Sequence, residues 1–102
     1  MFVVELFLPL ETSKGEPVPA AAFDRIKAEL TERFGGVTAF LRSPAEGAWK
    51  PSGGHVVHDR VAIFEVMVDD VDTAWWHRYR EALEREFDQQ QILARLYQVT
   101  VL

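Results

Sequence analysis

The stretch from Pro19 to Gly36, PAAAFDRIKAELTERFGG, predicts a helix together with both of its ends. Its large apolar residues recur every three or four positions and therefore share one stripe of a helix, at Phe23, Ile26, Leu30 and Phe34. Pro19 suits the first helical turn, where the N–H that proline lacks would have no partner. Gly35 and Gly36 suit the left-handed backbone that commonly ends a helix.

Apolar, strand-like segments lie on both sides of this helix. Residues 2–10 precede it and residues 37–42 follow it, and both are rich in Val, Phe and Leu. Residues 43–54 hold several Gly and Pro residues and predict a loop. Residues 55–68 then alternate between apolar and polar positions, as a long strand does.

The last third of the chain predicts a second helix and a fourth strand. The aspartates of residues 69–72 suit a helix start, because carboxylates accept hydrogen bonds from free N–H groups there. A buried stripe follows at Trp76, Tyr79, Leu83 and Phe87, and residues 92–102 form the last strand. With right-handed crossovers, this order predicts an α+β, ferredoxin-like βαββαβ sandwich. Its antiparallel sheet has the strand order 4-1-3-2 and carries both helices on one face.

Composition narrows the class of protein. The 102 residues allow one domain, over 1–102, and apolar and charged shares of 48% and 26% are those of a globular protein. The net charge of −5 argues against nucleic acid as a partner, and the absence of cysteine excludes a disulfide framework. No uncharged run is long enough to cross a bilayer, and the first residues lack the basic start of a signal peptide. We therefore expect a cytoplasmic protein with no membrane partner.

Because successive strand residues point to opposite faces, one face of the sheet is left without helices, and we call it the open face. Its expected large apolar residues include Phe7, Phe40, Ile63, Met67 and Tyr97. Its expected charged residues form one row across the sheet, in the order Arg95, Glu5, Glu65 and Arg42. Apolar groups with a few converging polar groups are typical of a small-molecule cavity. Two such faces packed together would enclose one, which predicts a homodimer through the open face.

These patterns predict a site for a small, partly apolar organic molecule. The expected ligand-binding residues are Glu5, Phe7, Phe40, Arg42, Trp49, Met67, Arg95 and Tyr97. Two neighbouring carboxyls raise the pKa of one of them, so Glu65 is the expected proton carrier, with His58 as a second candidate base. The alternative is that the charges are only cross-strand ion pairs and that the open face serves dimerisation alone.

Other chemistry has weaker support in the sequence. His55, His58 and Asp59 include metal-ligand types, but a spacing of three in a strand sends the two imidazoles to opposite faces. We therefore expect no metal, and no motif indicates a bound cofactor. Trp49 lies in the predicted loop. Its side chain is expected either to close over the open face or to pack against the edge of its own domain or against a dimer partner.

The chain also resembles the dimeric α+β-barrel proteins of bacteria. The resemblance rests on the element order, the half-apolar open face, and the stretch Glu-Arg-Phe-Gly-Gly-Val-Thr-Ala-Phe (32–40) followed by Gly-Ala-Trp (47–49). It implies a homodimer with one pocket per subunit. Members of that group include cofactor-independent monooxygenases, lactone isomerases, haem enzymes and ligand-sensing modules, and no motif transfers a catalytic residue to this chain.

Overall fold

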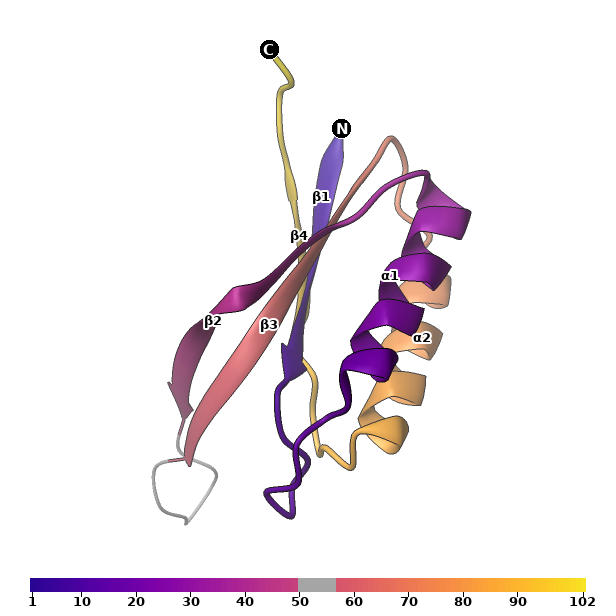
Figure 1. Ribbon diagram of the computed structural model, residues 1–102. Coiled ribbons are helices and arrows are strands. Elements are labelled where there is room, and N and C mark those ends of the chain that lie inside the picture. The colour runs from indigo at the N-terminus through magenta and orange to yellow at the C-terminus, as the bar shows by residue number, and fades with distance from the viewer. Residues whose placement is uncertain (50–56) are drawn as a thin grey trace.

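A computed structural model describes residues 1–49 and 57–102 and confirms the predicted α+β fold (Figure 1). The elements in chain order are β1 (Phe2–Pro9), α1 (Ala20–Phe34), β2 (Thr38–Trp49), β3 (Val57–Val68), α2 (Thr73–Glu86) and β4 (Ala94–Gln98). The antiparallel sheet has the order β2-β3-β1-β4, which is the predicted order read from the other edge. Both helices lie on one face of the sheet, and the other face is open (Figure 1).

The core lies between this sheet and the two helices. Alternate residues of β1, and of β3 from Ala62 onward, point into it, as the alternation predicts: Val4, Leu6 and Leu8, and Ala62, Phe64, Val66 and Val68. The helices contribute the predicted stripes, which include Phe23, Ile26, Leu30, Trp76 and Leu83. Because these residues fix which face of each strand is buried, they also fix which side chains reach the open face.

Backbone chemistry sets the ends of both helices. Gly35 has φ 85 and donates its N–H to the carbonyl of Thr31, so α1 ends in the predicted left-handed cap. The Asp72 carboxylate accepts a hydrogen bond of 3.1 Å from the Trp75 N–H at the start of α2. The predicted acidic start of the second helix is therefore confirmed at Asp72.

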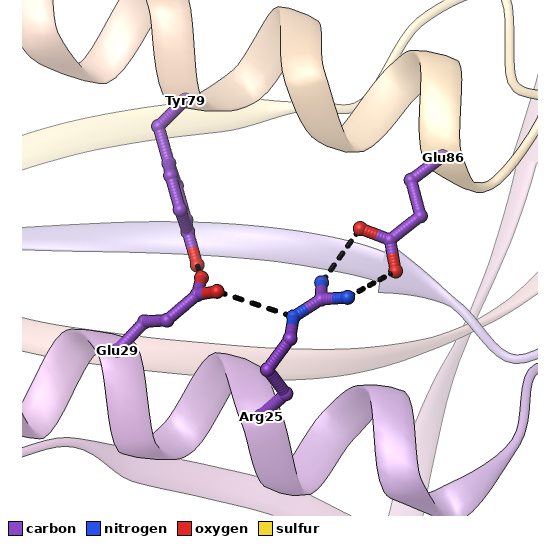
Figure 2. Close-up of polar contacts among 4 residues, drawn as sticks. All are labelled: Arg25, Glu29, Tyr79 and Glu86. Atoms are coloured by element: carbon purple, nitrogen blue, oxygen red, sulfur yellow. Dashed lines mark hydrogen bonds and ion pairs between the residues drawn. The ribbon is translucent and has the colours of Figure 1, made fainter.

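A network of polar side chains fastens the two helices to each other on their outer side (Figure 2). The Arg25 guanidinium donates to both carboxylate oxygens of Glu86, at 2.7 and 2.6 Å, and its Nε lies 3.2 Å from Glu29. The Tyr79 hydroxyl donates to the other oxygen of Glu29 at 2.7 Å. Burial and this hydrogen bond raise the pKa of the Tyr79 phenol, so the hydroxyl keeps its proton. The network therefore links the two helices that cover the core. It lies on the helix side of the sheet, away from the open face.

The predicted loop over residues 43–54 is wrong for its first half, because β2 continues as a strand to Trp49. The pairing of β2 with β3 shifts between Phe40, opposite Ile63, and Ala45, opposite Val61. Pro44 lies within this bulge, where the ladder needs no N–H, so a proline there does not end the strand. Residues 50–54 of the predicted loop lie outside the described residues.

The predicted last strand over residues 92–102 is too long at both ends, because β4 covers only Ala94–Gln98. Ile92 is buried in the core before the strand begins, and its N–H donates to the Glu84 carboxylate of α2. Leu96 points to the helix side, as the sequence predicts, but 45% of its surface is exposed. β4 is thus a short edge strand with an uncovered apolar residue.

Candidate functional site

Three successive rows of side chains on the open face run across the sheet and concern the site. The register places Tyr97, Val3 and Met67 in the first row, which we call the Tyr97 row. The second, the charged row, is Arg95, Glu5, Glu65 and Thr38. The third, the Phe7 row, is Phe7, Ile63 and Phe40. The charged row therefore lies between two apolar rows.

Glu5 is the buried charge of this face. Only 6% of its surface is exposed, and its carboxylate accepts a hydrogen bond of 2.8 Å from the Nε of Arg95. The Arg95 side chain is 60% exposed, and its guanidinium lies 5.0 Å from the centre of the Phe7 ring. A charge as buried as Glu5 needs such a partner, because water no longer solvates it. Arg95 therefore contacts both Glu5 and Phe7, while more than half of its side chain stays accessible to solvent.

Glu5 on β1 and Glu65 on β3 lie directly opposite each other on neighbouring strands. In an antiparallel ladder, pairs joined by backbone hydrogen bonds alternate with pairs that are not. The Leu10 N–H donates to the Arg60 carbonyl, so these two residues form a hydrogen-bonded pair. Five positions back along the ladder, Glu5 and Glu65 therefore form a pair without mutual backbone hydrogen bonds. Such pairs have Cα atoms only about 4.5 Å apart, which brings their side chains together. Desolvation, a hydrogen bond to Glu5 and its charge all raise the pKa of the Glu65 carboxyl.

Tyr97 adds a phenol to the same neighbourhood. Partial desolvation and the negative charges of Glu5 and Glu65 raise the pKa of its hydroxyl, and Arg95 opposes this shift. The phenol therefore stays a hydrogen-bond donor near the acid pair at neutral pH. Together, a phenol, two carboxyls and a guanidinium offer both donors and acceptors to a bound molecule.

The predicted position of Arg42 in the charged row is wrong, because Thr38 stands opposite Glu65. Arg42 falls in the bulge between Phe40 and Ala45, beyond the point where the register shifts. The register before the bulge is the reason, since with Phe40 opposite Ile63 an unbroken ladder would place Arg42 opposite Val61 and not opposite Glu65. The side chain of Arg42 lies outside the described residues.

The structure brings most of the predicted site residues together on one face. These are Glu5, Phe7, Phe40, Glu65, Met67, Arg95 and Tyr97. Phe40, Met67 and Tyr97 are all exposed there. Thr38 was not predicted as a site residue, because only the observed register, and no pattern in the sequence, places it opposite Glu65.

Trp49 and His58 lie farther along the β2–β3 hairpin, at the pairs Trp49–Val57 and Ala48–His58. His58 is seven positions from Glu65 on β3, which is about 23 Å of extended strand. Glu65 therefore belongs to the charged row, and position 58 lies far from it. The side chains of Trp49, His58 and Asp59, and the whole of His55, lie outside the described residues.

Two further features are absent from the part of the chain that the structure describes. There, no three His, Cys, Asp or Glu side chains gather closely enough to hold a metal ion. Neither of the helices described combines the length and apolar character that a bilayer crossing requires.

Comparison with known proteins gives a similar fold. No protein-family model matches this sequence, and no curated protein matches it either. A phage SAM lyase solved in complex with S-methyl-5′-thioadenosine is similar over 95% of this chain and 80% of that chain, with a TM-score of 0.63 and 12% identity. The same enzyme in its apo state gives a TM-score of 0.61 over 94% and 78% of the two chains, also at 12% identity. At this identity the likeness establishes a shared fold.

Proposed function

We propose that this chain binds a small, partly apolar organic molecule on its open face, against the Glu5–Glu65 pair. The observation that carries the proposal is the charged row between two apolar rows. A ligand lying across the face would contact the rings of Phe7 and Tyr97 while its polar groups meet the carboxyls and Arg95. This combination of apolar walls and a few convergent polar groups is typical of small-molecule sites.

The proposal includes a second copy of the chain packed across the open face. Phe40, Met67 and Tyr97 are exposed on that face, and a second sheet would remove them from water. The charged row would then line the space between the two sheets. The homodimer implied by the resemblance to dimeric α+β-barrel proteins has this geometry.

In its catalytic form, the proposal assigns proton transfer to Glu65. Its raised pKa favours a carboxyl that holds a proton more readily than an ordinary glutamate and can pass it to a bound molecule. Such a group suits the cofactor-independent isomerase or monooxygenase chemistry implied by the same resemblance. The shared fold with a phage SAM lyase adds a specific probe, the S-methyl-5′-thioadenosine bound to that enzyme.

The test combines native mass spectrometry with titration calorimetry. Spectra of the protein as purified should show a chain pair that carries a small non-covalent mass, and S-methyl-5′-thioadenosine is then titrated into the stripped protein. Glu65→Gln should weaken that binding by about tenfold, or about 1.4 kcal/mol. Glu32→Gln, at an exposed position on α1, should leave it unchanged. Absence of both a bound mass and measurable binding overturns the proposal.

The alternative function is a dimerisation module with no ligand. The apolar rows favour it, because their exposed side chains would pack in any sheet-to-sheet contact. It predicts a dimer whose mass equals that of two chains, with no heat on titration of S-methyl-5′-thioadenosine. The Glu65→Gln variant should give the same two results.

A further inference from the structure

We propose that the outer edge of β4 pairs with the β4 of a second copy, in an antiparallel register that places Leu96 opposite the partner's Leu96. This surface goes beyond the proposed function, because it uses the free edge of the sheet, with side-chain contacts on both faces along that edge. Within the described residues, no strand pairs with this edge of the sheet. β4 can therefore accept a fifth strand on that side.

The backbone hydrogen bonds of β4 select this register. Phe7 donates its N–H to the carbonyl of Leu93, and Val99 donates to that of Met1. Because antiparallel pairs alternate, Arg95 and Tyr97 also direct their backbone groups toward β1. The N–H and C=O groups of the residues between them point outward, at Ala94, Leu96 and Gln98. A two-fold axis at Leu96 aligns these free groups with those of the second copy.

The side chains agree with this register on both faces of the sheet. On the helix side, Leu96 is 45% exposed beside a groove of about 170 Å³ that Val4 and Trp76 help to line. The leucine of the second copy would cover this apolar surface. On the open face, Arg95 would lie beside the second copy's Tyr97, and Tyr97 beside the second copy's Arg95. A guanidinium beside an aromatic ring is a favourable contact, and the two-fold axis forms it twice.

The two edges of the sheet differ in a way that also favours pairing at β4. The β2 edge carries a bulge with Pro44, a combination that discourages pairing with another strand. The five residues of β4 have neither a bulge nor a proline. Because β4 is short, its backbone bonds alone give a small interface, and the paired leucines and the Arg95–Tyr97 contacts must supply the rest.

Cysteine cross-linking tests the register directly, because the chain has no cysteine of its own. In the proposed pair the Cα atoms at position 96 are about 5.5 Å apart, which is within disulfide range. Leu96→Cys should therefore give a covalent dimer under mild oxidation at low protein concentration. Gln98→Cys is the matched control on the same strand, because the two copies of position 98 would lie about 13 Å apart, beyond disulfide reach. Equal cross-linking of both variants, or cross-linking of neither, overturns the proposal.

Light scattering on a size-exclusion column gives the second test. Leu96→Lys should halve the number of chains in the assembly, because two ammonium groups would meet at the axis. Leu102→Lys places the same charge at an exposed leucine beyond the end of β4 and should leave the mass unchanged. An unchanged mass for Leu96→Lys overturns edge pairing. Whether the wild-type protein binds S-methyl-5′-thioadenosine is a separate result and bears only on the proposed function. Leu96 lies on the helix side of the sheet and not on the open face, where that molecule would bind.

Discussion

Replacing Glu65 with glutamine should stabilise the protein at neutral pH. In the wild type, two carboxyls face each other in a closely spaced cross-strand pair, and Glu5 is almost fully buried. Glutamine keeps the size of the side chain and removes one charge. Its amide also donates a hydrogen bond to the Glu5 carboxylate, which the ionised Glu65 cannot do.

The size of the effect follows from the separation of the two carboxyls. Coulomb's law gives about 0.8 kcal/mol for two unit charges roughly 5 Å apart in water, and about 3 kcal/mol at an effective dielectric of about 20. Arg95 neutralises part of the charge on Glu5, and Glu65 is only half-buried. We therefore expect a gain near the lower figure, about 1 kcal/mol, which is about 4 °C in Tm for a domain of this size.

The gain should depend on pH in one direction. Because folding raises the pKa of Glu65 above its ordinary value of 4.5, the folded state keeps this proton to higher pH than the unfolded chain does. The contribution of Glu65 to stability is therefore complete below pH 4.5 and is lost as the pH rises through the folded pKa. Glu65→Gln should match the wild type in acid and exceed it at pH 7.

Urea unfolding of both proteins from pH 3 to pH 8, at one protein concentration, measures this difference. Glu32→Gln is the control for removing one negative charge from an exposed helix position. The reasoning is refuted if Glu65→Gln is less stable than the wild type at pH 7, or if its advantage persists unchanged at pH 3.

Three further substitutions test the parts of the fold that position the site, and urea unfolding at pH 7 measures each. Tyr79→Phe removes the hydrogen bond to Glu29 between the helices and should cost about 1 kcal/mol, and a loss near zero would show that this contact is not stabilising. Asp72→Ala removes the N-cap of α2 and should also cost about 1 kcal/mol, an effect that Asp72→Asn should largely avoid. Gly35→Ala should cost about 1 kcal/mol because φ is 85 there, whereas Gly36→Ala, with equal open space around its Cβ, should cost less; equal losses would contradict the conformational explanation.

The sequence was sufficient for the order of elements and for the faces of the inner strands. Strong helical stripes and the glycine after Phe34 locate α1, and alternation assigns Leu6 and Phe64 to the core. Once a core residue is placed, its neighbours must reach the open face, because the side-chain period of a strand is two. This parity is why the sequence alone predicts that Glu5 and Glu65 share a face.

Parity alone does not identify the partner across the ladder. A slip of two residues preserves every buried side chain and still changes each cross-strand pair. The register at the start of β2 gives Thr38 the place expected for Arg42, and the bulge after Phe40 then shifts the pairing again, to Ala45 opposite Val61. Bulges depend on how a strand bends against its neighbour, and the proline that marks this one was equally compatible with the loop predicted over residues 43–54.

The exposure of Leu96 has a different origin. Its apolar character and its parity both predict a core position, and the structure does turn it to the helix side. Burial also requires a covering element, and two helices do not cover the full width of a four-stranded sheet at this edge. How far a helix layer extends depends on packing between elements distant in sequence, which no local pattern reports.

The energetics of Glu5 favour the ligand-binding proposal over dimerisation alone. Val3 and Phe7 precede and follow it on the same face, so an apolar residue at position 5 would complete a continuous apolar surface. Burying a carboxylate costs desolvation free energy, and Arg95, its partner, is mostly exposed, so the Glu5–Arg95 pair adds little that the fold requires. A face used only for packing against a second sheet would be more stable with an apolar residue at position 5. Glu65, half-buried beside Glu5, lowers the stability further through like-charge repulsion. Binding of a polar ligand group gives these charges a role that packing does not.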